Sequence, residues 1–332
     1  MHTIIVNGHH SFSCGDDETI LEAGQRAGFS FPVACRNGVC ERCRGELVSG
    51  SVRIQRHGHT IHAGETGSDA VLYCVAHALT DCEIYVPDVR APGQLPVHEV
   101  TCQIVNVSDL NADVARVQLR LPAGKRIDWH AGQYLELLFP FGDCAFSIAN
   151  APGGRDIELH VRYGAHNSSS LDVIAALRND SLVKVRLPGG QRFIDQLPAQ
   201  PVWFICGSTG FAPVKAMLEK LRNDGFTLPV RLYWGARTAS DLYLHDTATA
   251  FAVEMPNLTY IPALSEEKHD GMFAGLVHEA VLDDLKQLDG VTQPLFYVGG
   301  SVPMAWAVFD ALVAAGVPAE NIHSDVYDYA PR

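Results

Sequence analysis

The sequence predicts a multidomain chain made of a small α+β domain, a six-stranded antiparallel β-barrel and an α/β domain with a parallel sheet. Three observations predict this order. Residues 1–88 mix short strand signals with one helix, and residues 99–199 hold short alternating apolar runs with little helix between them. Residues 200–332 alternate apolar strands with helices. A chain of 332 residues is long enough for several such cores.

In the first domain we expect strands at 3–6, 45–54 and 83–86 and a helix at 19–27. Residues 89–98 are punctuated by proline and glycine, so we interpret them as a linker.

Four cysteines in this domain carry the strongest chemical signal. Cys35, Cys40 and Cys43 have the spacing Cys-x4-Cys-x2-Cys, and Cys74 follows about thirty residues later, which is the plant-type [2Fe–2S] spacing. Gly38 lets the loop wrap closely enough for backbone amides to point at the sulfides. A zinc ribbon would need a second Cys-x2-Cys pair. A Rieske centre would need two Cys-His pairs, and Cys74 with His77 supplies only half of that pattern.

The other cysteines indicate where the chain works. The total of 9 is odd, and the remaining five lack paired spacing, which argues against a disulfide framework and for a reducing compartment. Residues 1–6 resemble a strand and not a signal peptide, and no run of eighteen apolar residues occurs. We therefore expect a cytoplasmic protein without membrane spans.

The net charge of −13 disfavours general binding to nucleic acid or anionic membranes. Around the cysteine loop the sign reverses, because Arg36, Arg42 and Arg44 cluster there. These arginines are either a solvated rim or a docking patch for an acidic electron acceptor, and the sequence leaves both interpretations open.

The barrel is predicted from six runs, at 102–107, 114–121, 133–139, 145–149, 157–162 and 182–187. One helix at 171–177 interrupts them and is preceded by Ser168, Ser169 and Ser170. These serines either cap the helix or accompany a phosphate bound at its N-terminus.

The α/β domain is predicted from strands at 202–206, 230–234, 258–261 and 295–298 and helices at 214–221, 276–285 and 304–314. Glycine turns follow three of these strands, at 207–213, 235–237 and 299–301. None has the Gly-Lys-Ser/Thr of a nucleoside-triphosphate loop. Glycine turns at the carboxyl ends of parallel strands favour a bound dinucleotide.

With these motifs together, the whole chain resembles the iron–sulfur flavoprotein reductases of the ferredoxin–NADP reductase superfamily. The stretches Ser147-Ile-Ala-Asn-Ala-Pro-Gly153, Glu158-Leu-His-Val-Arg162, Gly207 to Pro213 and Leu232-Tyr-Trp-Gly-Ala-Arg-Thr238 carry the resemblance. It implies a β-grasp ferredoxin domain, an FAD barrel and an NAD(P)H domain. Within the family the chain is most similar to reductase components of multicomponent oxygenases and to CDP-6-deoxy-glucoseen reductases.

The resemblance also implies roles for individual residues. Cys35, Cys40, Cys43 and Cys74 would hold the cluster. Phe146, Ser147 and Ile148 would lie against the flavin, with the Ser147 hydroxyl near N5, and Tyr327 would cover the flavin face until nicotinamide displaces it. His160, Val161 and Arg162 would line the flavin ring and ribityl chain, and Ser168, Ser169 and Ser170 would take the pyrophosphate. The nicotinamide nucleotide would meet Gly207, Thr209, Gly210, Gly299, Gly300 and Ser301, while Gly235 and Arg237 would approach its adenosine side.

Two positions depart from the family pattern. Cys144 stands where the family has an Arg that binds the FAD phosphates, and Gly299 stands where it usually has Cys. Loss of such a charge-assisted hydrogen bond costs roughly 1.5 to 3 kcal/mol. Arg155 and Arg162 are the candidates to compensate.

From these observations we expect an NAD(P)H-dependent reductase that passes electrons through FAD and the cluster to a protein acceptor. NADH is favoured, although Arg237 and Thr238 could receive a 2′-phosphate. A terminal oxygenase is the expected acceptor, a deoxysugar dehydrase the alternative, and a flavin-poor redox sensor the rival from another class. We expect a monomer.

Overall fold

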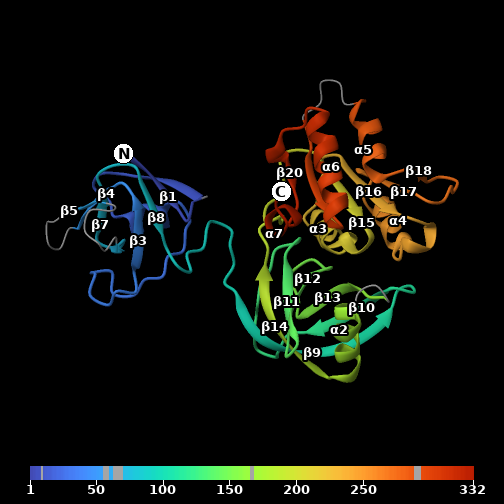
Figure 1. Cartoon of the computed structure of the whole chain (residues 1–332), viewed down its shortest axis with the longest axis horizontal. Coiled ribbons are helices and arrows are strands. Elements are labelled where there is room, and N and C mark those ends of the chain that lie inside the picture. The colour runs from blue at the N-terminus through green and yellow to red at the C-terminus, as the bar shows by residue number, and fades with distance from the viewer. Residues whose placement is uncertain (9, 55–59, 63–69, 165–167, 288–292) are drawn as a thin grey trace. The chain divides into compact units, whose positions relative to one another are not determined.

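The structure is a computed structural model, and it describes residues 1–8, 10–54, 60–62, 70–164, 168–287 and 293–332 (Figure 1). The chain forms two compact units, Met1–Pro96 and Val97–Arg332. A further domain boundary at residue 199 stays a prediction.

The N-terminal unit is built on a five-stranded sheet of order β2-β1-β8-β3-β6 and a three-stranded sheet of order β5-β4-β7. A capping box in which Thr19 and Glu22 bond each other's backbone amides starts its helix. The elements are β1 (His2–Val6), β2 (His10–Cys14), α1 (Ile20–Arg26), β3 (Arg44–Ser49), β4 (Ser51–Ile54), β5 (Thr60–His62), β6 (Ala70–Leu72), β7 (Ala76–Ala78) and β8 (Cys82–Tyr85).

The single strand predicted at 45–54 is wrong, because β3 and β4 belong to different sheets. Gly50 separates them with a φ of 90°, and a Cβ there would collide with the Asp81 carbonyl oxygen. The chain can therefore turn between the two sheets only at a residue without a side chain.

The second unit begins with a curled antiparallel sheet of order β12-β11-β14-β9-β10-β13. A bridge between Ile148 and Leu159 joins the two edges, and the Ala149 amide donates to the Glu158 carbonyl at 2.7 Å. This closure confirms the predicted six-stranded barrel. Its elements are β9 (His98–Asp109), β10 (Val114–Arg120), β11 (Tyr134–Phe139), β12 (Gly142–Ser147), β13 (Asp156–Arg162), α2 (Ser168–Asn179) and β14 (Leu182–Gly189).

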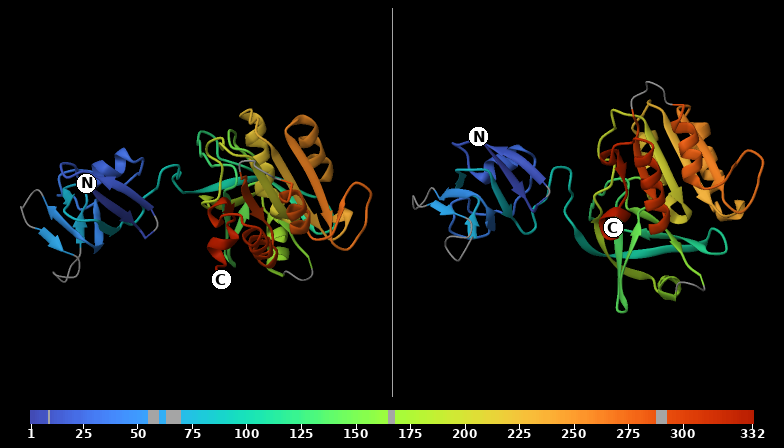
Figure 2. Two further views of the ribbon diagram at one scale, coloured as in Figure 1. Left: turned by 90° about the horizontal axis from the view of Figure 1, so that it is seen from above. Right: turned by 45° about the horizontal axis from the view of Figure 1, so that its top comes forward.

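A parallel sheet of order β18-β17-β16-β15-β19-β20 follows, with helices on both faces (Figure 2). Helices α3 and α4 cover one face and α5, α6 and α7 the other, so each face has its own core. The elements are β15 (Val202–Gly207), α3 (Phe211–Asn223), β16 (Val230–Ala236), α4 (His245–Glu254), β17 (Leu258–Leu264), β18 (Phe273–Ala274), α5 (Val277–Leu285), β19 (Leu295–Gly299), α6 (Val302–Ala314), β20 (Ile322–His323) and α7 (Val326–Tyr329).

The predicted parallel α/β domain is confirmed, and the sheet's central strands explain where a ligand can enter. Chain order reverses between β15 and β19, so the loops that follow these two strands flank a crevice. Helix α4 was not predicted, because it buries only Ala248 and Phe251 and shows little periodicity. Among the described helices, none has the length and apolar character that crossing a bilayer requires.

Candidate redox and nucleotide sites

Cys35 and Cys40 lie on an exposed loop whose backbone curls around the first sulfur, and Cys43 at the end of this loop is buried. Arg36, Gly38 and Glu41 have φ values of 57°, 75° and 55°, which turn the chain tightly. The Cys40 amide donates to Cys35 Sγ at 3.4 Å. Hydrogen bonds from backbone amides, those of Asn37 and Cys40 first, lower the pKa of the Cys35 thiol to about 6. Amides aimed at sulfur are what an anionic iron–sulfur centre requires.

Cys43 and Cys74 form a second, buried pair whose Sγ atoms lie 2.9 Å apart. The Tyr73 amide donates to the Cys43 carbonyl at 3.1 Å and so holds the two segments together. Burial, followed by the Cys43 thiol, raises the pKa of Cys74 to about 12. A coordinated cation overcomes such a shift because it deprotonates its thiol ligands.

Within the described part of the chain, no three His, Cys, Asp or Glu side chains gather where one ion could sit. The four cysteines instead form two pairs, Cys35 with Cys40 through an amide-to-sulfur hydrogen bond and Cys43 with Cys74 through a sulfur–sulfur contact. Four thiolates on two irons provide two for each iron, so the arrangement fits the cluster that the spacing predicts.

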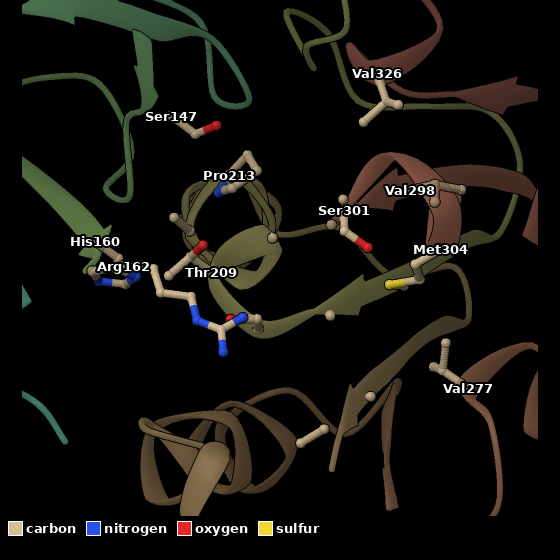
Figure 3. A pocket seen from close by; sticks show the side chains of 18 of the residues that line it. Ser147, His160, Arg162, Thr209, Pro213, Val277, Val298, Ser301, Met304 and Val326 are labelled. Atoms are coloured by element: carbon tan, nitrogen blue, oxygen red, sulfur yellow. The ribbon is translucent and has the colours of Figure 1, made fainter. Parts of the chain in front are cut away.

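The second unit contains a cavity of about 770 Å³ between the barrel and the carboxyl ends of the parallel strands (Figure 3). This volume is in the range of small-molecule and cofactor sites. Most of the cofactor residues predicted from the sequence line it: Phe146, Ser147, His160, Arg162, Ser170, Gly207, Thr209, Gly210, Gly235, Arg237, Gly299, Gly300 and Ser301.

The barrel side of the cavity comes from β12 and β13. Ser147 ends β12, while His160 and Arg162 lie two residues apart on β13 and therefore face the same way. Arg162 Nε donates to Asp113 Oδ2 at 2.9 Å, and its side chain remains half exposed at the cavity. This side thus offers an aromatic ring, a hydroxyl, an imidazole and a cation.

Several predicted residues lie elsewhere. Ile148 and Val161 are buried in the barrel core, so their side chains do not line the cavity. The prediction for Tyr327 needs correction, since its ring packs on Trp306 and its hydroxyl donates to the Ala305 carbonyl at 3.0 Å. Tyr329 borders the cavity instead. The side chains of Ser168 and Ser169 lie outside the described residues.

On the other side, the loops after β15 and β19 approach each other backbone to backbone. A Cβ on Gly299 would lie 2.7 Å from the Gly210 carbonyl oxygen, and one on Gly210 would lie 2.6 Å from the Gly300 nitrogen. Met304 Sδ covers Gly300, where an added Cβ would come within 2.7 Å of it. Glycine is therefore required at this contact, which leaves no room for the family's cysteine at position 299.

Three acidic residues that line the cavity were not predicted, namely Asp113, Asp241 and Asp325. Asp241 lies 3.7 Å from Arg237 Nε, and Asp325 lies directly before α7. Burial, and then the Asp328 carboxylate, raise the pKa of Asp325 to about 7. The sequence holds only weak signals for Asp241 and Asp325. Asp241 opens an Asp-Leu-Tyr stretch shortly after Arg237, and Asp325 follows a short strand, but neither signal is specific.

Cys144 lies two residues before Phe146 on β12 and packs against the barrel core. Arg155 cannot replace the missing cation there, because its guanidinium donates twice to the Leu121 carbonyl, at 3.1 and 2.7 Å. Arg162 does line the cavity, so it remains the candidate.

One unit carries a loop with cysteines, and the other holds a cavity shared by a barrel and a parallel sheet. Together they define a protein that combines an iron–sulfur cluster with flavin and pyridine nucleotide. Comparisons with known proteins agree. The 2Fe-2S iron-sulfur cluster binding domain matches residues 4–79, and the oxidoreductase NAD-binding domain matches residues 204–310.

Relatives match over nearly the whole length. The CDP-6-deoxy-L-threo-D-glycero-4-hexulose-3-dehydrase reductase of Yersinia pestis is 31% identical over 322 residues, which cover 95% of each chain. Reductase component 1 of terephthalate 1,2-dioxygenase from Comamonas sp is 28% identical and covers 97% of this chain and 95% of its own. The crystal structure of an Amycolatopsis cytochrome P450 reductase superimposes with a TM-score of 0.65 at 27% identity, covering 98% of each chain.

The chain belongs to the iron–sulfur flavoprotein reductases of the ferredoxin–NADP reductase superfamily. It is an NAD(P)H-dependent oxidoreductase whose cofactors are a [2Fe–2S] cluster, FAD and NADH or NADPH.

Proposed function

We propose that this chain is the reductase component of a multicomponent oxygenase and delivers electrons from the cluster to the terminal component. The observation that carries the proposal is the cavity that Ser147 of the barrel and the glycine loops of the parallel sheet line together. FAD, when bound, supplies the conversion between two-electron hydride donors and one-electron iron–sulfur acceptors. The resemblance to the Comamonas reductase component supports this choice of acceptor.

A deoxysugar dehydrase is the second candidate acceptor. The 31% identity to the Yersinia pestis dehydrase reductase favours it, and that relative spans the same two units. We place the protein in the cytoplasm as a monomer. Nine cysteines without a disulfide among them support a reducing compartment.

The reductase activity is tested first on the purified full-length protein. We expect bound flavin and iron, and NADH-dependent reduction of cytochrome c. NADH and NADPH are compared in the same assay, because the ion pair between Arg237 and Asp241 could orient either toward a ribose. A protein that carries the cluster but neither binds flavin nor oxidises NADH or NADPH would instead be a redox sensor.

The proposed acceptors are distinguished by pairing the reductase with the proteins encoded beside it. Product formation by an oxygenase component supports the proposal, whereas turnover of a nucleotide-linked deoxysugar by a dehydrase component supports the alternative.

Flavin retention tests the departure at position 144. Cys144 shares a strand face with Phe146, which lines the cavity, so an Arg at this position could reach a bound phosphate. We expect the wild type to lose FAD on dilution and Cys144→Arg to bind FAD about tenfold to a hundredfold more tightly. FAD fluorescence during dialysis measures this, and Cys144→Ser is the uncharged control. Stoichiometric FAD in the wild type, unchanged by the Arg, would contradict the prediction.

We further propose that the acceptor docks at the cluster loop, on Arg36, Arg42 and Arg44. All three are exposed, and Val39 beside them is 59% exposed. Arg44 Nη1 lies 3.3 Å from Glu41 Oε2, but both side chains are more than half exposed, so this pair contributes little. An exposed apolar residue on the same loop as three exposed cations suits a partner with an acidic face.

Neutralising Arg42 and Arg44 to Gln is expected to raise the KM for the acceptor severalfold and to flatten its dependence on salt. Reduction of flavin by NADH should not change. The control is Lys125→Gln with Arg126→Gln, which removes the same charge from an exposed turn of the second unit. Stopped-flow measurements over a salt series compare the three proteins, and equal slopes would show that the arginines are a solvated rim.

A further inference from the structure

A buried ion pair on helix α3 holds the segment that follows the flavin-side residue Ser147. Lys215 is only 8% exposed, and its Nζ donates to the Ala149 carbonyl at 3.0 Å and to Glu219 Oε1 at 2.7 Å. The other oxygen of Glu219 accepts from the Ala151 amide at 2.8 Å. The Lys215–Glu219 pair of the parallel-sheet domain is therefore hydrogen-bonded to a backbone carbonyl and a backbone amide of the barrel that lie two residues apart.

The same lysine lies beside a chain of polar groups that ends at the cavity. Lys215 Nζ is 3.5 Å from Glu158 Oε1, and that oxygen is 2.8 Å from His160 Nε2. His160 Nδ1 is 2.9 Å from the Tyr243 hydroxyl. A carboxylate can only accept, so Nε2 carries the proton and Nδ1 accepts from the tyrosine. These contacts define both the tautomer and the ring orientation of a residue that lines the cavity.

The charges in this network balance. Lys215 and Arg116 face Glu158 and Glu219, and Arg116 Nε lies 3.7 Å from Glu158 Oε1. Burial would raise the pKa of Glu158, but the hydrogen bond from His160 and the charge of Lys215 lower it to about 2. Apolar side chains of similar size would often stabilise such a contact as well or better. Stability alone therefore does not explain a charged network here.

Its location suggests a geometric role. Helix α3 begins at Phe211, directly after the turn of Thr209 and Gly210 that lines the nucleotide side of the cavity. Lys215 is about one helical turn further on, so it links that turn to Ala149 and, by way of Glu158, to His160.

We propose that Lys215 is a positioning residue for hydride transfer, which holds the flavin side of the cavity at a set separation from the nucleotide side. This inference rests on the proposed reductase function. The transfer moves a hydrogen with its electron pair from the dihydronicotinamide to the flavin, and Lys215 takes no part in the bonding. Reacting atoms must approach to about 3 to 3.5 Å, so a small shift between the two sides slows the step strongly.

The test compares the limiting rate of flavin reduction by NADH with ligand binding in the full-length protein loaded with FAD. For Lys215→Met we expect the limiting rate to fall about tenfold or more, while the Kd values for NADH and FAD change less than about twofold. The flavin absorption spectrum should shift, because Ala149 loses its bond to helix α3 and Glu158, which orients His160, loses a neighbouring cation. Lys215→Arg should restore much of the rate.

The control is Lys220→Met on the same helix. Lys220 also forms an i,i+4 pair, with Asp224 at 2.8 Å, but within the described chain neither side chain forms a hydrogen bond or ion pair with the barrel. The Lys220→Met variant should leave both the limiting rate of flavin reduction and the flavin spectrum unchanged. Because Lys215→Met leaves the partly buried Glu219 carboxylate without its cation, Lys215→Met with Glu219→Gln is measured as well, and it should show the same slow reduction.

A folded double variant that holds FAD and is reduced at the wild-type rate would overturn the proposal. Loss of folding or of FAD in both Lys215→Met and the double variant would also overturn it, since that result would make the lysine a general structural support. If NADH fails to reduce the wild type, the proposed function fails instead, and the two failures are thus distinguishable.

Discussion

Replacing Cys40 or Cys74 with Ser is expected to remove the visible absorbance of the cluster and to lower cytochrome c reduction by at least about a hundredfold. Cys40 belongs to the exposed pair and Cys74 to the buried one, so each substitution removes a ligand from a different pair. Reduction of flavin by NADH should survive, because the cavity is built wholly from the second unit. Absorbance spectra and stopped-flow flavin bleaching measure the two effects separately.

Cys14→Ser is the matched control in the same unit. Cys14 is buried, and its Sγ already lies near the Gly15 and Glu18 carbonyls, so a serine hydroxyl there has acceptors. This variant should keep both the cluster and the activity. Loss of flavin reduction in the Cys40 or Cys74 variants would show that the two centres are not separable.

Gly210→Ala is expected to slow flavin reduction by NADH about a hundredfold. An added methyl group would collide with the Gly299 carbonyl and lie 2.6 Å from the Gly300 nitrogen. Both neighbours are backbone, so the two loops must separate at the point where the nucleotide side of the cavity closes. Overpacking of this kind also costs roughly 1 to 3 kcal/mol of stability. Single-turnover kinetics and the Tm report these two effects.

Gly154→Ala serves as the control, because a Cβ at that position has only the Asp156 nitrogen within 4 Å, at 3.9 Å. It should be neutral in both measurements. Chemical reduction of the Gly210 variant with dithionite should still bleach the flavin and the cluster. Wild-type kinetics with NADH in Gly210→Ala would show that the close loop contact does not shape the nucleotide site.

The sequence predicts the repeating parts of the fold well, because apolar periodicity is a local property. This periodicity predicts strands β9 to β14, and it also predicts the alternation of strands and helices that begins at β15. The misses are short or weakly patterned elements, such as the two-residue strands β18 and β20. The break at Gly50 was also missed, since a long-range contact with Asp81 and not a local signal decides it.

For the site, the cysteine spacing and the glycine turns can be recognised from the sequence alone, because the chemistry of a cluster or a phosphate needs particular residues at short separations. Where side chains meet across distant segments, only the tertiary structure decides. Tyr329 and not Tyr327 borders the cavity because α7 turns Tyr327 onto α6. The contact of Lys215 with Ala149 joins residues 66 positions apart, which no local pattern encodes.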